Sequence, residues 1–215
     1  MFMKKSVARF LLVVAMCSGS IASAVEVIVL HPSVDMTTFN GIGRDGVTIP
    51  GNQAGNADIS YTRLYERFLL PAYVDGTTIS RATFDVATSS ITNTNRALQI
   101  FATNNHWKPE AVANNGARPV PTGQMLGQVA QGFNLHQSID LTDFVNVAYQ
   151  HGDGMVSFVV MSYQEDRAWK DSINFLSGKT LNISITSAVP EPSTYLMLLL
   201  GLAFIGGTAY KRRMR

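Results

Sequence analysis

Four histidines are the side chains most able to bind a metal ion, and they are scattered along the chain as His31, His106, His136 and His151. None of them stands in a zinc-binding spacing such as H-E-x-x-H. His136 with Asp140, and His151 with Asp153, could share a metal, but isolated polar loop residues explain both pairs more simply. We therefore expect no metal site and no cofactor.

Carboxylates are the next candidates for chemistry, with 15 Asp and Glu residues in the chain. Two of them held on either side of a sugar could hydrolyse a glycosidic bond, but no spacing singles out such a pair. Asp153, Asp166 and Asp171 could supply oxygen ligands to a structural Ca²⁺, although no calcium-loop pattern accompanies them. There is no G-x-S-x-G turn. We expect no catalytic residues, and the alternative is an extracellular polysaccharide-active enzyme, a lyase or a glycosidase.

The segment Gly41–Gly46 has the spacing G-x-G-x-x-G. In a dinucleotide-binding fold this spacing lies between a strand and the start of a helix. Here the preceding strand is expected to end near Leu30, and the following residues 47–52, which include Pro50, cannot begin a helix. We therefore interpret the segment as a flexible loop.

Two tryptophans, Trp107 and Trp169, are the aromatic side chains best suited to contact a sugar. Trp107 lies beside His106 in an Asn-rich loop, where its ring could stack on a sugar while polar neighbours bind hydroxyls. The competing interpretation is that this indole plugs one end of the fold. Trp169 lies in a polar stretch and is the better exposed candidate. His106, Trp107 and Trp169 are thus the candidate ligand contacts.

Alternation of apolar and polar residues indicates β-strands through most of the chain. The expected strands are 25–30, 61–70, 79–87, 97–102, 155–163 and 181–186. One short helix is expected between Asp140 or Thr142, as its cap, and Gly152. The segments 40–56 and 104–123 are expected as long exposed loops. This pattern predicts an all-β fold, an antiparallel β-sandwich or jelly roll with one short helix.

Six short segments carry a resemblance to a known family: RFLLP at 67–71, ISRATF at 79–84, HWKPE at 106–110, DLTDFV at 140–145, NFLS at 174–177 and LNISI at 181–185. In this order they resemble the paired strands, W-x-E loop, helix start and closing strand of the DNRLRE-type β-sandwich, which is classed as a carbohydrate-binding module. The charged hexad that names the family is absent. The resemblance implies a carbohydrate-binding type of β-sandwich at residues 25–187.

Residues 1–24 have the pattern of a secretory signal peptide. A basic start and an apolar core precede a small-residue cleavage site formed by Ala22, Ser23 and Ala24. The one cysteine, Cys17, follows the bulky Met16, which disfavours lipoprotein processing. Cleavage after Ala24 would leave an exported domain that has no cysteine and can form no disulfide.

The C-terminal segment, residues 188–215, has three parts. Pro190, Glu191 and Pro192 form a stiff motif, and an uncharged stretch at 195–210 follows. As a helix this stretch would be roughly 24 Å long, so with its flanking residues it could span a hydrocarbon core of about 30 Å. The chain closes with a basic stop-transfer group, Lys211, Arg212, Arg213 and Arg215. This group would stay in the cytoplasm and leave the domain outside.

This three-part end resembles the PEP-CTERM sorting signal of Gram-negative bacteria. The resemblance implies export to the cell envelope, outer surface or extracellular space, after transient anchoring in the inner membrane by the C-terminal helix. It also implies an exosortase as partner, with processing near the Pro-Glu-Pro motif. Proteins with this signal accompany exopolysaccharide and biofilm systems.

The formal net charge of +2 comes from the two ends of the chain, since residues 25–187 contain 10 basic and 14 acidic residues. An acidic domain has no general attraction to nucleic acid or to other anionic polymers. The sequence therefore predicts an exported, non-catalytic β-sandwich protein of the envelope or biofilm matrix that could bind exopolysaccharide.

Overall fold

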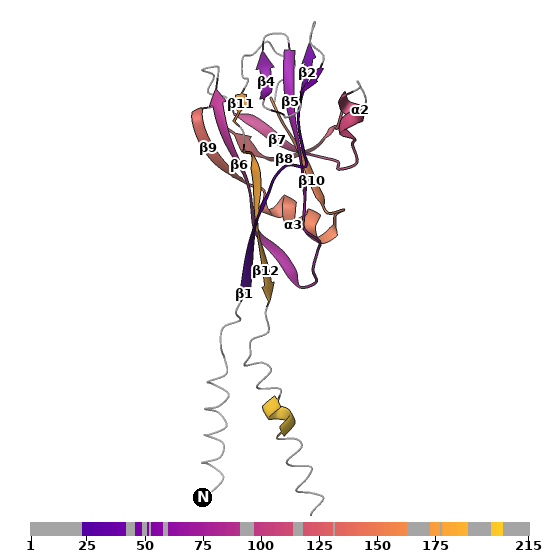
Figure 1. Cartoon of the computed structure of the whole chain (residues 1–215), viewed down its shortest axis with the longest axis vertical. Coiled ribbons are helices and arrows are strands. Elements are labelled where there is room, and N and C mark those ends of the chain that lie inside the picture. Colours follow the sequence, from indigo (N-terminus) through magenta and orange to yellow (C-terminus); the bar gives the residue numbers. More distant parts are fainter. Residues whose placement is uncertain are drawn as a thin grey trace, which may run out of the picture. The chain divides into compact units, whose positions relative to one another are not determined.

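The computed structural model describes residues 23–41, 46–48, 51, 53–57, 60–90, 97–113, 118–130, 132–162, 173–176, 178–188 and 199–203. Glu26–Thr186 form one compact unit (Figure 1), and the two ends of the chain, Met1–Val25 and Ser187–Arg215, are separate from it in the division of the chain. The described residues include no helix long and apolar enough to cross a membrane. Of the predicted spanning stretch 195–210, only residues 199–203 are described, and they are helical.

The elements of the chain are mostly strands. In order they are β1 (Ser23–Leu30), β2 (Val34–Gly41), β3 (Gly46–Thr48), β4 (Gln53–Ala57), β5 (Ser60–Leu69), β6 (Thr77–Ser90), β7 (Leu98–Thr103), α2 (Pro109–Ala113), β8 (Pro121–Val129), β9 (Phe133–Asp140), α3 (Thr142–His151), β10 (Met155–Met161), β11 (Ile173–Phe175) and β12 (Thr180–Ala188).

These strands form two layers. In one layer β6 pairs with β9, β11 and β12, and β1 lies beyond β12. In the other layer β5 pairs with β2 and β10, and β7 and β8 follow β10. The short strands β4 and β11 pair with each other and connect the layers. The predicted all-β, antiparallel class is confirmed.

Three fully buried phenylalanines form the centre of the core between the layers. Phe84 of β6 packs edge-to-face on Phe158 of β10, with ring centroids 4.8 Å apart. Phe68 of β5 stacks on Phe158 at 5.8 Å. Burying each such side chain stabilises the fold by about 1.5–3 kcal/mol. Because the rings come from both layers, the layers pack face to face as in a β-sandwich.

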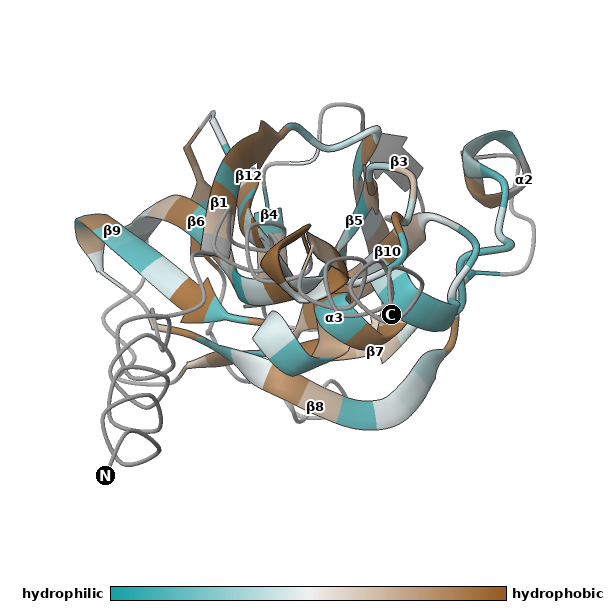
Figure 2. Cartoon of the chain, turned by 90° about the horizontal axis from the view of Figure 1, so that it is seen from below, coloured by the Kyte–Doolittle hydropathy of each residue, from teal (hydrophilic) through white to brown (hydrophobic). Residues whose placement is uncertain are grey.

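The helix α3 contacts strands of both layers, β6 and β10 (Figure 2). Its side chains also accept hydrogen bonds from the backbone of β6, in the part of that strand before Thr83, where the pairing with β9 begins. Asn146 Oδ1 accepts a hydrogen bond from the Ile79 N–H at 2.9 Å, and Thr142 Oγ1 accepts one from the Ala82 N–H at 2.9 Å. The helix therefore takes the place of a neighbouring strand along this part of β6.

The ends of α3 agree with the predicted helix, but its cap does not. Leu141 is the N-cap residue, and no side chain caps the helix. Asp140 instead binds the Thr142 N–H at 2.9 Å from just outside the helix. At the other end the Gly152 N–H donates to Ala148 O, which would lie only 2.3 Å from a Cβ at Gly152. A glycine is therefore required there.

Several sequence predictions need correction. The segment 40–56 is not one loop, because it contains β3 and β4, and the segment 104–123 contains α2 and the start of β8. Pro109 suits the first position of α2, since its missing N–H would have no partner in a helix. The described part of the domain thus holds two short helices instead of the predicted one. The strands β2, β8 and β9 were not predicted; Figure 2 shows hydrophilic and hydrophobic residues mixed along β8 and β9.

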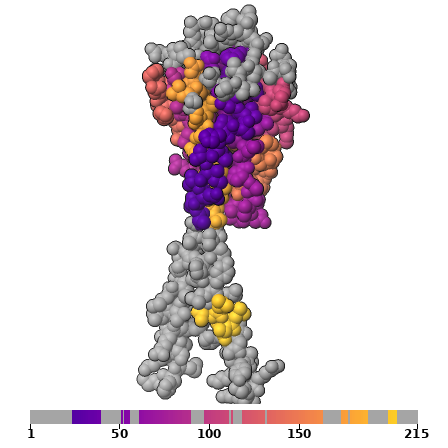
Figure 3. Space-filling view, viewed as in Figure 1, coloured from indigo at the N-terminus to yellow at the C-terminus, as the bar shows by residue number. Residues whose placement is uncertain are grey.

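The first strand is more exposed than its sequence predicts. Val25, Val27 and Val29 are apolar, yet they are 59%, 67% and 55% exposed. Figure 3 shows β1, in indigo, at the surface. The reason is its position at the end of the strand order, where β12 is its one partner among the described strands.

Candidate functional site

The outer face of three strands forms a polar surface, and we call it the β9–β6–β12 face. His136 and Ser138 of β9 point outward with Asp85 of β6, because Ser138 is the register partner of Asp85 and strand side chains alternate. Asn182 of β12 belongs to the same face, since its Nδ2 donates to Asp85 Oδ2 at 2.5 Å. The face therefore combines acid, amide, hydroxyl and imidazole groups.

A groove of about 240 Å³ lies on the β9–β6–β12 face. Asp85, His136 and Ser138 line it, together with Gly178 at the turn before β12. The second carboxylate oxygen of Asp85, Oδ1, has no hydrogen-bond partner among the described residues. Oδ1 is also buried, so the groups of the groove that are exposed to a ligand are the imidazole of His136 and the hydroxyl of Ser138. Both can form hydrogen bonds with hydroxyls.

A second groove, of about 310 Å³, lies between β8 and the start of α3. It contains the carboxylates of Asp140 and Asp143. Asp140 Oδ1 accepts hydrogen bonds from the Thr142 hydroxyl at 2.5 Å and the Thr142 N–H at 2.9 Å. These hydrogen bonds lower the pKa of Asp140, so its carboxylate stays ionised and is poorly suited to donate a proton to a leaving group.

Trp107 is buried, with 8% of its surface exposed. The Arg67 guanidinium lies 4.2 Å from the centre of its ring, and the ring of Tyr65 lies 5.8 Å away. Arg67 also donates a hydrogen bond to the Trp107 carbonyl. A second apolar cluster, separate from the main core, consists of Met36, Tyr65, Trp107, Val112 and Val159. The indole therefore covers the outer face of the β2–β5–β10 layer instead of plugging an end of the sandwich.

The other predicted ligand contacts do not join Trp107 on one surface. The His106 side chain is 84% exposed, with Nε2 3.9 Å from Asp153 Oδ2. Asn105 Nδ2 donates to Asp153 Oδ1 at 3.0 Å, which ties this loop to the turn before β10. Trp169 lies outside the described residues. A ligand-binding role for His106, Trp107 and Trp169 stays a prediction.

One of the pairs considered for metal binding is separated along a strand. His136 and Asp140 both lie on β9, where four residues span about 13 Å, so they are too far apart to share an ion. Asp166 and Asp171 lie outside the described residues. Among the residues that are described, no group of three or more His, Cys, Asp or Glu side chains could hold a metal ion.

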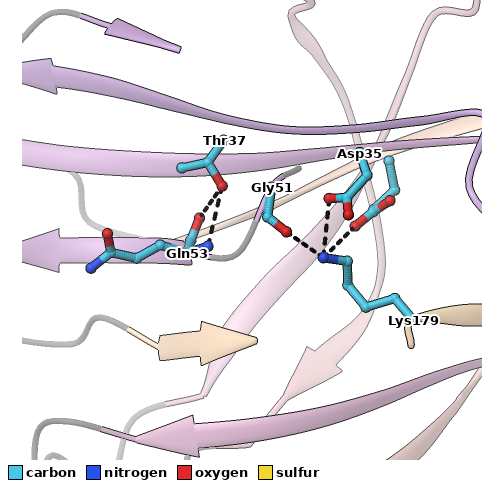
Figure 4. Close-up of polar contacts among 6 residues, drawn as sticks. Asp35, Thr37, Gly51, Gln53 and Lys179 are labelled. Carbon is cyan, nitrogen blue, oxygen red and sulfur yellow. Dashed lines mark hydrogen bonds and ion pairs between the residues drawn. The ribbon is translucent and has the colours of Figure 1, made fainter. Parts of the chain in front are cut away.

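A buried cluster of charged side chains, Asp35, Glu66 and Lys179, was not predicted, and we call it the buried triad. Lys179 Nζ lies 3.0 Å from Asp35 Oδ1 and 3.5 Å from Glu66 Oε1, and it donates a hydrogen bond to the Gly51 carbonyl (Figure 4). The side chains of Lys179 and Glu66 are 4% and 0% exposed. Burial raises the pKa of Glu66 well above its ordinary value; Lys179 opposes this shift and Asp35 adds to it.

Most residues of the predicted sorting and processing signals lie outside the described residues. This holds for Ala22, the Pro190–Pro192 motif and the basic group 211–215. Ala24 is described, and it is an exposed residue of β1. Cleavage after Ala24 would therefore leave a new N-terminus within this strand.

Comparison with known proteins identifies one part of the chain. Residues 188–213 match the PEP-CTERM protein-sorting motif, and the match begins at the last residue of β12. This motif implies a protein that is exported to the cell envelope or surface and targeted by an exosortase. No curated protein shows a significant match to the chain.

Proposed function

We propose that this chain is a non-catalytic polysaccharide-binding protein of the bacterial envelope or biofilm matrix, sorted by an exosortase. The match of residues 188–213 to the sorting motif carries the export and sorting part of this proposal. In it, the predicted helix at 195–210 anchors the chain in the inner membrane until the exosortase cleaves near Glu191. Residues 25–187 then act outside the cell.

The β9–β6–β12 face supports the binding part of the proposal. Its groove is formed on a sheet surface, and His136 and Ser138 supply hydrogen-bonding groups for hydroxyls along a sugar chain. Residues 25–187 carry more acidic than basic residues, 14 against 10, so a neutral glycan suits the domain better than an acidic one. The resemblance of residues 61–185 to the DNRLRE-type β-sandwich also favours a carbohydrate ligand.

The state of Asp140 supports a non-catalytic role. In the groove beside α3, which holds both Asp140 and Asp143, Thr142 engages Asp140 and lowers its pKa. Glycosidases require one carboxyl group with a raised pKa as general acid and a second carboxylate on the other side of the scissile bond. The lowered pKa of Asp140 does not meet the requirement for the general acid.

Affinity electrophoresis of residues 25–187 in gels containing the host exopolysaccharide tests the binding proposal. We expect retardation by neutral glycans that does not depend on salt, since no charge pairing is involved. His136→Ala should weaken the retardation, whereas His31→Ala, an exposed histidine outside the groove, should not. Loss with His106→Ala but not with His136→Ala would move the site to the Trp107 loop.

Two results would replace the proposed function with another. An absence of retardation with all neutral and acidic glycans would remove binding and leave a structural role in the matrix. Release of reducing ends or unsaturated sugars on incubation with the same glycans would favour the enzyme alternative, a glycosidase or a lyase.

An immunoblot in an exosortase-deletion strain tests the sorting part. We expect the protein to keep its C-terminal segment, to run at higher apparent mass and to remain with the membrane fraction. Unchanged mobility and unchanged surface release would contradict exosortase processing.

A further inference from the structure

The buried triad joins three segments that are far apart in the sequence. Asp35 of β2 and Glu66 of β5 are direct register partners in neighbouring antiparallel strands. Side chains in such positions have Cβ atoms about 4.5–5.5 Å apart, and like charges there repel each other. Lys179, next to the start of β12, brings its Nζ within 3.0 Å of one carboxyl group and 3.5 Å of the other.

The charges of the triad do not balance if all three groups ionise. One ammonium group would then face two carboxylates in a site where Glu66 is fully buried, and an unpaired buried charge is strongly unfavourable. The raised pKa of Glu66 indicates how this is resolved, because that carboxyl group keeps its proton. The triad then holds an amine, a carboxyl group that can be acylated, and a second carboxyl group that carries a proton.

We propose that the buried triad forms an intramolecular isopeptide bond, an amide between Nζ of Lys179 and Cγ of Asp35, with Glu66 as the proton-transfer residue. This inference does not depend on polysaccharide binding. It concerns how an exported domain without cysteine is cross-linked, since the one cysteine of the chain is Cys17, before the predicted cleavage site.

The bond forms by condensation and needs no oxidant or other co-reactant. A proton passes from the Lys179 ammonium group to the Asp35 carboxylate, a transfer that removes both buried charges. The nitrogen lone pair then attacks Cγ of Asp35, while protonated Glu66 polarises the carbonyl oxygen. Glu66 takes a proton from the new C–N centre and gives one to the departing hydroxyl group. The C–O bond breaks, water leaves, and Glu66 ends in its starting protonation state.

The surroundings of the triad suit both the reaction and its product. The Gly51 carbonyl accepts a hydrogen bond from Nζ and would hold the remaining N–H of the amide. It can approach only because residue 51 lacks a side chain, as a Cβ there would lie 2.6 Å from Asp35 Oδ1. The ring of Phe175, 5.8 Å from Nζ, adds an apolar wall. In the product, Glu66 donates to the amide oxygen and the amide N–H donates to Gly51, so no net charge stays buried.

Peptide mapping of the processed protein, recovered from envelopes and denatured before trypsin digestion, tests the proposal. Trypsin does not cleave after an acylated lysine. We expect a branched peptide in which residues 25–44 are joined to the uncut segment that begins at residue 171 and includes Lys179. Its mass should be one water less than the sum of its two parts. Two separate peptides with full cleavage after Lys179, from a protease-resistant folded protein, would overturn the bond and leave an ionic cluster.

Variants separate the roles of the three residues. Lys179→Arg and Asp35→Ala should abolish the branched peptide, whereas Lys108→Arg, which changes an exposed lysine, should leave it intact. Glu66→Gln keeps the shape of the side chain and should also abolish the branched peptide. Complete cross-linking in folded Glu66→Gln protein would overturn the proton-transfer role. Should Glu66→Gln fail to fold, the apolar Glu66→Leu gives the same comparison without a buried amide.

Discussion

Gly51 packs closely against Met36 and Leu64, and its carbonyl accepts a hydrogen bond from Lys179 of the buried triad. Changing it to Ala would place a Cβ within 2.5 Å of Leu64 Cδ1 and 2.7 Å of the Met36 carbonyl carbon. We expect the free energy of unfolding to fall by about 1–3 kcal/mol, as is typical of overpacking, measured by urea denaturation. Gly127→Ala is the control, because its one close neighbour is a side-chain methyl, Cγ2 of Ile139, whereas a Cβ at Gly51 would also meet backbone. Equal losses in the two variants would contradict the close packing at Gly51.

The buried carboxyl group of Glu66 makes stability depend on pH. Burial raises the pKa of Glu66, with Lys179 opposing the shift. The folded chain therefore keeps a proton that the unfolded chain releases above the ordinary pKa of Glu. We expect the free energy of unfolding to decrease as pH rises from the ordinary pKa of Glu through the raised one.

Urea midpoints measured across this pH range in wild type and in Glu66→Gln check the expectation. The variant has no titrating proton at this position, so the decrease should disappear. Asp140→Asn is the control of opposite sign, since hydrogen bonds from Thr142 lower the pKa of Asp140 and its contribution is lost as pH falls. A profile for Glu66→Gln that matches wild type would exclude Glu66 as the source.

At the level of elements, α3 supports β6 by hydrogen bonds that a strand would otherwise make. Asn146→Ala removes the acceptor of the Ile79 N–H. We expect a loss of about 1–3 kcal/mol in the free energy of unfolding, the cost of leaving a buried polar group unpaired. Val147 lies on the same helix and is 61% exposed, so Val147→Ala should change stability much less. Equal effects would show that helix propensity, not the bond to β6, determines the loss.

The strands that the sequence predicted are those with strong apolar alternation. Tyr61–Leu70, for example, corresponds to β5, with Leu64 and Phe68 fully buried. The strand β8 was missed because most of its side chains are exposed and because Gly123 and Gly127 resemble turn residues. In β9 the outward residues are polar and the inward position 137 is also polar, since Gln137 binds the backbone of Ala130. Local pattern could not reveal these strands, because pairing with β6 and β7 stabilises them.

The candidate site was less predictable than the strands. Glu66 stands in a predicted strand where a charged residue would be expected to face water, and only the approach of Lys179 across the fold explains its burial. The groove on the β9–β6–β12 face depends on the register of β6 and β9, which the sequence did not indicate. The sorting motif was predictable because it consists of contiguous residues, and the match at 188–213 confirms that prediction.

At the level of the whole molecule, β12 completes the domain. A chain that ends at Gly178 lacks the buried Leu181, Ile183 and Ile185. Their burial contributes about 1.5–3 kcal/mol each, a sum comparable with the 5–15 kcal/mol that stabilises a typical domain. We expect this truncated chain to be unfolded by far-UV circular dichroism and sensitive to protease, and a chain that ends at Ala188 to fold. Native-like spectra for both chains would contradict a structural need for β12.

The position of β12 also determines when the domain can complete its fold during export. It lies between β1 and β6 in the sheet, although it is the last of the described strands in the sequence. A chain threaded through the membrane from its N-terminus therefore delivers β1 first and then holds it without its partner until residues 180–188 emerge. The sorting motif begins at residue 188, so the domain can close only as the motif reaches the membrane. Maturation outside the cell and recognition by the sorting enzyme thus begin within the same short interval of transit.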